Sequence, residues 1–246
     1  MSAVEALIRL HLDTPRQGPG DPALLDRMVA AVKPPFAPQV ADLGCGTGAT
    51  AIRLAERLGA SVLAVDAAAP FIAALADRLE AQRPVAGRVT PVLGDMLAPP
   101  VAPGSLDLIV SEGAAYAVGF ETALAAWRPL VRPGGGCVVS ECVWWGADRP
   151  AEAAGFWAEG YPGMGSVADA LAAAEQAGWR FAAAERLPAA AWWTSYYDPL
   201  RARIAALKPG ADKALAEAIA ESEREMAVFE RFSDAYGYVL LALVAP

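Results

Sequence analysis

Short apolar runs alternate with helical segments along most of the chain, and this alternation limits the possible folds more than any other feature. The runs hold consecutive aliphatic residues and predict strands, whereas the stretches between them carry the 3.6-residue apolar period of helices. Strands are predicted at 39–43, 61–65, 88–93, 106–110, 136–143, 179–187 and 238–244. Helices are predicted at 2–12, 22–33, 49–58, 70–82, 120–131, 151–159, 166–177 and 211–231. Near-continuous apolar strands between helices are typical of a parallel sheet covered on both faces, so we expect a doubly wound α/β fold.

Composition excludes several classes of protein. The chain has 246 residues, 55% of them hydrophobic, so it can bury a large core. Its net charge of −8 would repel a phosphate backbone, and we expect no nucleic-acid partner. One histidine and three cysteines provide neither a zinc site nor a disulfide framework. The N-terminus lacks a signal-peptide pattern and no apolar run reaches the roughly 20 residues of a membrane span, so we expect a cytoplasmic protein with no membrane partner.

The most informative motif is a glycine-rich loop between a predicted strand and a predicted helix. Residues 42–48 read Asp-Leu-Gly-Cys-Gly-Thr-Gly. Glycines allow a tight turn and let a ligand approach the bare backbone, while the start of the next helix offers free N–H groups. The spacing G-x-G-x-x-A also satisfies the nicotinamide dinucleotide fingerprint, so the loop alone leaves the ligand open. Its candidate cofactor-binding residues are Gly44, Cys45, Gly46, Thr47 and Gly48.

Three acidic residues at strand ends narrow the choice of ligand. Asp42 precedes the first glycine, where a carboxylate suits an ammonium group and would repel a pyrophosphate. Asp66 ends the second strand, where an acid accepts hydrogen bonds from ribose hydroxyls in such folds. Gly94, Asp95 and Met96 follow the third strand, where an acid can accept from an adenine amino group and a thioether can lie on the ring. Helix capping or core packing would explain each residue singly, but together they favour a nucleoside that carries an amino acid.

These motifs resemble those of class I S-adenosylmethionine-dependent methyltransferases. The resemblance rests on ADLGCGTG at 41–48, Asp66, GDM at 94–96, LDLIVSEG at 106–113 and RPGGGCVVSE at 132–141. It implies a Rossmann-like sheet of seven strands, of which the last is antiparallel. It also implies S-adenosyl-L-methionine as cofactor, with S-adenosyl-L-homocysteine as product. The residues that it adds to the expected cofactor site are Ala67, Ser111 and Glu112.

A narrower resemblance covers most of the chain. The segments RQGPG at 16–20, SEGAAYAVGFETALAAWRPLVRPGG at 111–135 and WWTSYYDPL at 192–200 resemble a bacterial group of small-molecule methyltransferases. In that group the RQGPG loop lies over the bound cofactor. The resemblance therefore implies that Arg16, Gln17 and Gly18 contact it.

We expect a single methyltransferase domain over residues 1–246. Residues 1–35 would form N-terminal helices and the cofactor-covering loop, and 36–145 the cofactor-binding core. Residues 146–246 would supply the remaining strands. A helical cap at about 188–237 would be inserted between strands six and seven, where the minimal fold has a short hairpin.

The methyl acceptor is expected beyond the carboxyl ends of the strands. Glu112 follows the fourth predicted strand, and a carboxylate there is costly to bury without a cation, a donor or cofactor atoms. We take Glu112 and Tyr116 as the candidate catalytic residues. A base is optional for an amine acceptor, whereas an unactivated hydroxyl needs one. His11 lies in an amphipathic segment and is expected to be an ordinary half-buried helix residue.

Aromatic residues gather outside the central strands. As a set they could exclude water from the acceptor or surround an alkylated ammonium, although a cap also needs aromatics for its own core. The predicted substrate-binding residues are Glu141, Trp144, Tyr161, Trp193, Tyr196 and Tyr197. The charged segment 211–231 is expected to be a solvated helix face.

Three functions remain open at this stage. The first is transfer of a methyl group from S-adenosylmethionine to a nitrogen or oxygen of a small molecule, by a monomer or homodimer without a metal. Glu112, Glu141 and the aromatics suit a cation and favour an amine slightly. The second is a non-catalytic S-adenosylmethionine-binding protein. The third is a nicotinamide-dependent oxidoreductase, against which Asp42 and the GDM segment argue.

Overall fold

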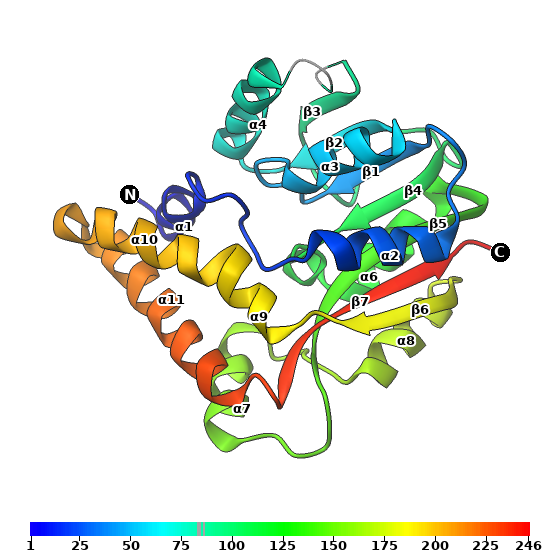
Figure 1. Ribbon diagram of the computed structural model, residues 1–246. Coiled ribbons are helices and arrows are strands. Elements are labelled where there is room, and N and C mark those ends of the chain that lie inside the picture. Colours follow the sequence, from blue (N-terminus) through cyan, green and yellow to red (C-terminus); the bar gives the residue numbers. More distant parts are fainter. Residues whose placement is uncertain (83–84, 86) are drawn as a thin grey trace.

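The computed structural model describes residues 1–82, 85 and 87–246, which form a seven-stranded sheet (Figure 1). The strand order is β3-β2-β1-β4-β5-β7-β6. Strands β1 to β5 pair in parallel, whereas β7 is antiparallel to both β5 and β6. The predicted doubly wound fold with an antiparallel last strand is confirmed. The bounds are β1 Gln39–Leu43, β2 Ser61–Asp66, β3 Val89–Leu93, β4 Leu106–Ser111, β5 Val131–Trp144, β6 Arg180–Arg186 and β7 Tyr236–Val244.

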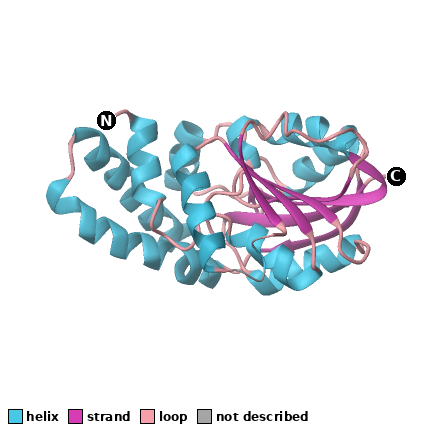
Figure 2. Cartoon of the chain, turned by 90° about the horizontal axis from the view of Figure 1, so that it is seen from above, coloured by secondary structure: helices cyan, strands magenta, loops and turns pink. Residues whose placement is uncertain are grey.

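Helices cover both faces of this sheet and extend beyond one end of it (Figure 2). One face packs against α2, α3 and α4, and the other against α6 and α8, with an apolar core under each layer. The bounds are α1 Ala3–His11, α2 Pro22–Val32, α3 Ala49–Leu58, α4 Ala69–Ala81, α6 Phe120–Trp127, α7 Ala151–Gly160, α8 Val167–Gln176, α9 Ala189–Trp192, α10 Asp198–Leu207 and α11 Lys213–Phe232. No helix of the described residues is long and apolar enough to cross a membrane.

Local capping fixes the helices that position the N-terminal loop. At α1, Ser2 and Glu5 form a reciprocal capping box. At α2, the Asp21 carboxylate accepts from the backbone N–H groups of Ala23 and Leu24, and Pro22 takes the first helical position. The loop 12–20 therefore ends at the capped N-terminus of α2.

One predicted boundary is wrong. The helix predicted at 120–131 ends at Trp127, a 3-10 turn covers Arg128–Leu130, and β5 begins at Val131 rather than at residue 136. Pro129 lacks an N–H group and therefore cannot continue the helical hydrogen bonds. The glycines that follow allow a register shift in the pairing with β4, between Leu106 and Leu108, and this lengthens the strand.

The predicted cap is present between β6 and β7. It consists of α9, a π-helix at Trp193–Tyr197, α10 and α11. Its aromatic core is centred on Trp192, which stacks on Phe229 with ring centroids 4.3 Å apart and meets Tyr238 of β7 at 4.7 Å. α1 packs against α10 and α11, and in Figure 1 it lies between the cap and α4. The N-terminal helix α1 and the cap thus enclose the carboxyl end of the sheet together.

Gly136 of β5 gives a test of the packing between α2 and the sheet. A Cβ atom at this position would collide with Val32 of α2 and with the Leu243 carbonyl of β7. We expect Gly136→Ala to lower the free energy of unfolding by about 1–3 kcal/mol, the usual cost of overpacking a core. Urea unfolding followed by circular dichroism measures this change.

Gly155→Ala is the matched control. Gly155 is an exposed residue of α7 with no atom within 4 Å of a built Cβ. It should be neutral or stabilise the protein by about 0.5–1 kcal/mol, because alanine favours the helix. Equal unfolding midpoints for the two variants would contradict the packing of α2.

Candidate active site

A cavity of about 510 Å³ lies beyond the carboxyl ends of β1, β2 and β4. The sheet forms its floor, while α1, the loop 12–20 and the cap residues of α11 and the π-helix complete its walls. It joins many of the predicted site residues, which come from distant parts of the sequence. They are Arg16, Gln17, Gly18, Asp42, Gly44, Cys45, Gly46, Asp66, Ala67, Asp95, Met96, Glu112, Tyr116 and Tyr196.

The glycine loop presents bare backbone to this cavity. Gly44 and Gly46 have φ values of 78° and 54°, which L side chains rarely adopt. A Cβ atom on Gly44 would also collide with Ala114 and come within 3.2 Å of the Met96 methyl group. Gly48, with φ of 83°, instead packs on Leu75 of α4 and lies outside the cavity wall. The loop therefore leaves room for a ligand at its first two glycines.

Asp42 is the most unusual group in the cavity. Its side chain is only 1% exposed, and Oδ2 has no hydrogen-bond partner among the described residues. Burial, reinforced by the neighbouring carboxylate of Glu112, raises the pKa of Asp42 to about 8, although Arg16 opposes this shift. A buried carboxylate without a partner is costly, so this position favours a ligand that carries positive charge.

Two further carboxylates lie along the same wall. Asp66 accepts the N–H of Gly46 and the N–H of Ala68, each at 2.8 Å, so β2 and the glycine loop are held together. Asp95 accepts the N–H of Leu97 at 2.8 Å. These backbone bonds fix the orientation of both carboxylates, and each keeps acceptor capacity for a ligand in the cavity.

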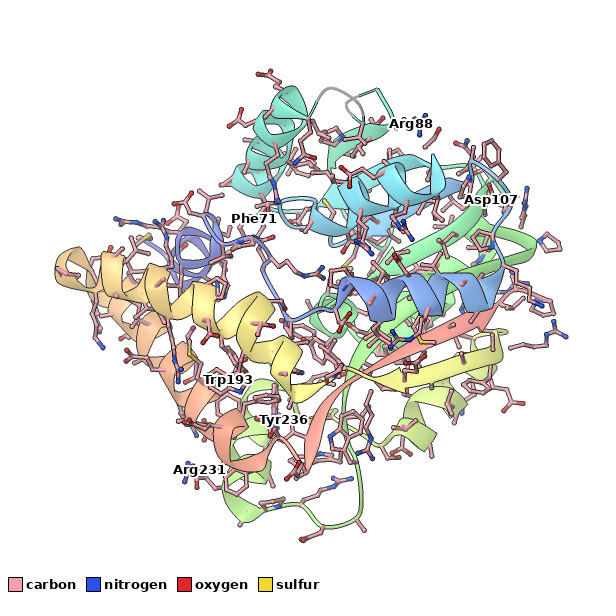
Figure 3. All side chains as sticks on the ribbon, viewed as in Figure 1. Phe71, Arg88, Asp107, Trp193, Arg231 and Tyr236 are labelled. Atoms are coloured by element: carbon pink, nitrogen blue, oxygen red, sulfur yellow. The ribbon has the colours of Figure 1, made fainter. Side chains whose placement is uncertain are left out.

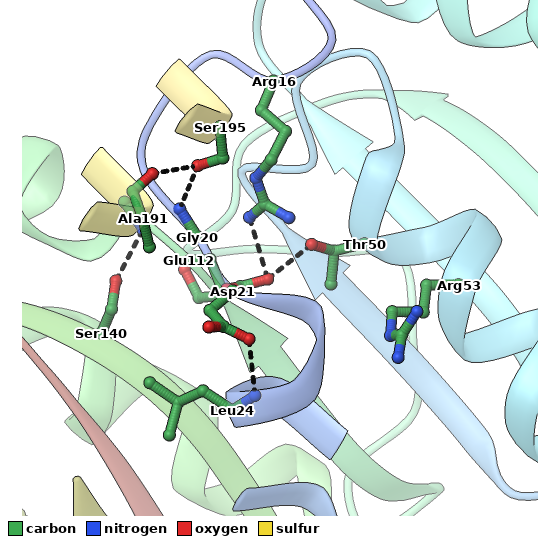
Figure 4. Close-up of polar contacts among 12 residues, drawn as sticks. Arg16, Gly20, Asp21, Leu24, Thr50, Arg53, Glu112, Ser140, Ala191 and Ser195 are labelled. Carbon is green, nitrogen blue, oxygen red and sulfur yellow. Dashed lines mark hydrogen bonds and ion pairs between the residues drawn. The ribbon is translucent and has the colours of Figure 1, made fainter. Parts of the chain in front are cut away.

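The loop 12–20 closes the cavity through a buried ion pair (Figure 4). Nη2 of Arg16 lies 3.1 Å from Oε2 of Glu112, and these side chains are 15% and 4% exposed. The hydroxyl of Thr50 donates to the same carboxylate oxygen at 2.6 Å. Glu112, a predicted catalytic residue, thus lines the cavity as the partner of the loop arginine. Its Oε1 remains without a partner among the described residues.

Gln17 connects the loop to the cofactor side of the cavity. Its Oε1 accepts the N–H of Thr47 at 2.8 Å, and its Nε2 donates to the His11 carbonyl at 3.2 Å. On the other side, the N–H of Gly20 donates to Ser195 in the π-helix at 3.1 Å. One loop therefore touches the glycine loop, the end of α1 and the cap.

Beyond this loop, one end of the cavity is lined by residues of α1 and the cap. Leu7 and Ile8 contribute apolar surface, while His11, Ser222 and Glu225 add polar groups. The phenol of Tyr197 donates to Glu225 at 2.8 Å, and burial raises the pKa of Glu225 to about 7. Tyr116 is 45% exposed and also lines this end.

Comparisons with known proteins agree with this geometry. Residues 40–135 match the methyltransferase domain family. Nocamycin O-methyltransferase of Saccharothrix syringae is 32% identical over 149 residues, which are 59% of this chain. The chain spans half the length of that relative. Both matches support a similarity of the chain to class I S-adenosylmethionine-dependent methyltransferases.

Solved structures show the same fold over most of the chain. A methyltransferase of Geobacter sulfurreducens, crystallised with S-adenosyl-L-homocysteine, superposes with a TM-score of 0.81 at 21% identity. The match covers 98% of both chains. The [4+2]-cyclase SpnF has a TM-score of 0.75 at 19% identity, covering 92% of this chain and 80% of its own. At these identities the likeness concerns the fold alone, since one fold supports different reactions.

Several predicted cofactor residues of the methyltransferase domain lie outside the cavity wall. The hydroxyl of Ser111 is fully buried and donates to the Leu43 carbonyl at 2.8 Å, so it joins β4 to β1. Thr47 is bound by Gln17 and by Arg78 of α4. Gly94 packs against Val65 and Val92, and Gly48 against α4.

The predicted substrate residues separate into three groups. Tyr196 lies in the cavity wall. Glu141 accepts from Tyr161 at 2.6 Å, and both line a second cavity of about 320 Å³ on the face covered by α6 and α8. The others pack in aromatic clusters, in which Trp144 meets Tyr236 edge-on and Trp193 packs on Tyr197 within the cap. Figure 3 labels Tyr236 and Trp193 of these clusters.

Three cavity residues, His11, Ser222 and Glu225, were not predicted from the sequence. A signal existed for the α11 residues. Ser222 lies three and four residues from apolar positions that α11 buries, and Glu225 is three residues further. Polar residues such as Ser222 and Glu225 on the buried face of a helix indicate that this face borders a cavity. The many charged residues of α11 instead suggested a face exposed to solvent. His11 carried no local signal beyond its helical period.

The Arg16–Glu112 pair can be tested by stability measurements. Arg16→Met leaves the buried Glu112 carboxylate without its cation, so we expect the free energy of unfolding to fall by up to about 3 kcal/mol. Adding Glu112→Gln to this variant should restore part of the loss. Urea unfolding of the two single variants and the double variant gives the coupling energy.

Arg27→Met provides the control, because the Arg27–Glu185 pair is exposed on both sides. Its removal should change the stability by less than about 1 kcal/mol. Additive effects of Arg16→Met and Glu112→Gln would show that the loop arginine does not stabilise the buried carboxylate.

Proposed function

We propose that this chain transfers the methyl group of S-adenosyl-L-methionine to an oxygen or nitrogen of a small-molecule acceptor. The observation that carries the proposal is the buried Asp42 carboxylate, which has an unpartnered oxygen and lines the same cavity as Gly44 and Gly46. An amino-acid ammonium satisfies this carboxylate, whereas a dinucleotide pyrophosphate would be repelled by it. Asp66 and Asp95 follow along the same wall.

The residues present fit the cofactor part by part. Asp42 would hold the ammonium group, Asp66 the ribose hydroxyls, and Asp95 with Met96 the adenine. When bound, the cofactor supplies a methyl group that its sulfonium has already activated. Arg16 and Gln17 would cover it, because both join the loop to the cofactor side of the cavity.

Alignment and exclusion of water are the main tasks left to the protein. α1, the loop 12–20 and the cap enclose the space beside the glycine loop, and this arrangement suits a small acceptor. The net charge of −8 disfavours a nucleic-acid acceptor. Nocamycin O-methyltransferase, the relative reported above, supports oxygen as the methylated atom.

The sequence favoured an amine slightly as the methyl acceptor, because Glu112 and Glu141 suit a cation, but neither residue supports this choice in the structure. Glu112 is neutralised by Arg16, and Glu141 lies in the second cavity on the other face of the sheet. The acceptor end instead offers His11, Tyr196 and Glu225, which can take part in proton transfer.

Ligand binding tests the cofactor directly. Titration calorimetry should show micromolar binding of S-adenosylmethionine and S-adenosylhomocysteine and no binding of NADH. Asp66→Ala should weaken the binding by about 1.5–3 kcal/mol, the scale of hydrogen bonds to charged groups. Asp148→Ala, at an exposed position remote from the cavity, is the control. Binding of NADH alone would overturn the proposal.

The pKa of Asp42 predicts a proton release. Asp42, with a pKa of about 8, is mostly protonated at pH 7 in the free protein, and an ammonium ligand favours its ionised form. Binding of S-adenosylhomocysteine at pH 7 should therefore release protons, and affinity should rise as the pH increases towards 8. Calorimetry in buffers of different ionisation enthalpy measures the release. Asp42→Asn should abolish the proton release that comes from Asp42. An unchanged proton release in this variant would contradict the proposal that Asp42 binds the ammonium group.

A further inference from the structure

His11 and Tyr196 form a hydrogen-bonded pair at the acceptor end of the cavity. His11 is the last residue of α1, and Tyr196 belongs to the π-helix of the cap. Nε2 of the imidazole lies 3.1 Å from the Tyr196 hydroxyl, and the rings stack with their centroids 5.9 Å apart. Both side chains line the cavity. α1 and the cap thus bring an imidazole and a phenol to one place.

The surroundings of His11 define its tautomer. Nδ1 lies 2.9 Å from the carbonyl oxygen of Leu7, which only accepts hydrogen bonds, so Nδ1 carries the proton. In the neutral ring Nε2 is then a bare acceptor, and the Tyr196 hydroxyl donates to it. The basic nitrogen of the only histidine in the chain therefore faces the Tyr196 hydroxyl in the cavity wall.

Burial favours the neutral form of both groups. It lowers the pKa of His11, although the hydrogen bond to Leu7 opposes this shift, and it raises the pKa of Tyr196. The other charged or titratable groups around this end come from every neighbouring element. They are Arg16 of the loop, Tyr116 after β4, Arg203 of α10, and Glu221 and Glu225 of α11.

We propose that Tyr196 and His11 accept the proton of a hydroxyl acceptor, which makes the substrate a phenol or an enol. This inference rests on the proposed methyltransferase activity. The acceptor O–H gives its proton to the Tyr196 oxygen while the Tyr196 hydroxyl proton moves to Nε2 of His11. The acceptor oxygen forms the new C–O bond as the C–S bond of the sulfonium breaks, and the thioether keeps that electron pair. The products are a methyl ether, S-adenosylhomocysteine and an imidazolium, which later releases its proton to solvent.

The acceptor class follows from the strength of this base. A neutral amine needs no base, so the pair would have no role with such a substrate. An imidazole with a lowered pKa is a weak base and cannot assist an aliphatic alcohol effectively, whereas a phenol, with a pKa near 10, is within its reach. The apolar side chains of Leu7, Ile8 and Val118 at this end also suit a flat ring.

The only histidine of the chain makes the pair visible by NMR without assignment. Long-range proton–nitrogen correlation should show a protonated Nδ1 and a bare Nε2, with a pKa below that of a free histidine. Tyr196→Phe keeps the stacked ring and removes the donor to Nε2, so the His11 pKa should rise. Tyr161→Phe, whose hydroxyl bonds Glu141 instead, is the matched control and should leave the signals unchanged. A bare Nδ1, or an unchanged pKa in Tyr196→Phe, overturns the pair.

Turnover tests the proton transfer itself. S-adenosylhomocysteine formation is measured with a panel of small phenols that are neutral at pH 7, including catechol, and with a matched panel of primary amines. Tyr196→Phe and His11→Gln should each lower kcat with phenols by about 100-fold or more, the scale of general base catalysis. Calorimetric affinity for S-adenosylhomocysteine should stay within about threefold of the wild type. In the wild type at saturating S-adenosylmethionine, so that Asp42 does not contribute, kcat/KM for the phenol should fall at acidic pH as His11 becomes protonated, and His11→Gln should lose this limb.

The outcomes separate the two proposals. Turnover of amines only, or of neither panel, overturns the hydroxyl acceptor. Full phenol turnover in both variants, with a large loss in Glu225→Gln, assigns the base to Glu225 and also overturns the inference. Failure of the wild type to bind S-adenosylhomocysteine overturns the proposed function instead.

Discussion

Two carboxylates are buried side by side at the carboxyl end of the sheet, and the structure around them follows from the need to compensate their charge. Glu112 obtains an ion pair from Arg16 and a hydrogen bond from Thr50. Asp42 keeps an oxygen without a partner among the described residues, and the proximity of Glu112 raises its pKa further. The loop arginine therefore closes the cavity over one acid, while the other remains suited to a cationic ligand.

The cofactor end could be predicted from the sequence because its geometry is local. Asp42, Asp66 and Asp95 each end or follow a parallel strand, and such strand ends meet at one edge of a sheet. The positive φ of Gly44 requires glycine, so the loop leaves a clear signature. Glu141 shows the limit of this reasoning. It alternates with Val139 and Val143 along β5 and so faces α6 and α8, which the period of two residues could have revealed.

The acceptor end could not be predicted in the same way, because it depends on contacts between α1 and the cap, which are far apart in the sequence. His11 meets a residue 185 positions away, and no local pattern records that contact. The π-helix adds a further difficulty. Its wider turn changes which aromatic side chains face inward, so Tyr196 reaches the cavity while Trp193 packs on Tyr197. The sequence alone did not indicate which of the neighbouring aromatic residues Trp193, Tyr196 and Tyr197 would line the cavity.

The same loop links both ends of the cavity, and this bears on the chemistry. Gln17 bonds the glycine loop and Gly20 bonds the cap, so closure over the cofactor and closure over the acceptor are coupled. A dry, acidic cavity disfavours any net change of charge during reaction. Methyl transfer removes the positive charge of a sulfonium, and a proton on His11 creates a positive charge within the same enclosure. The total charge of the cavity is therefore unchanged when the neutral His11 takes the proton.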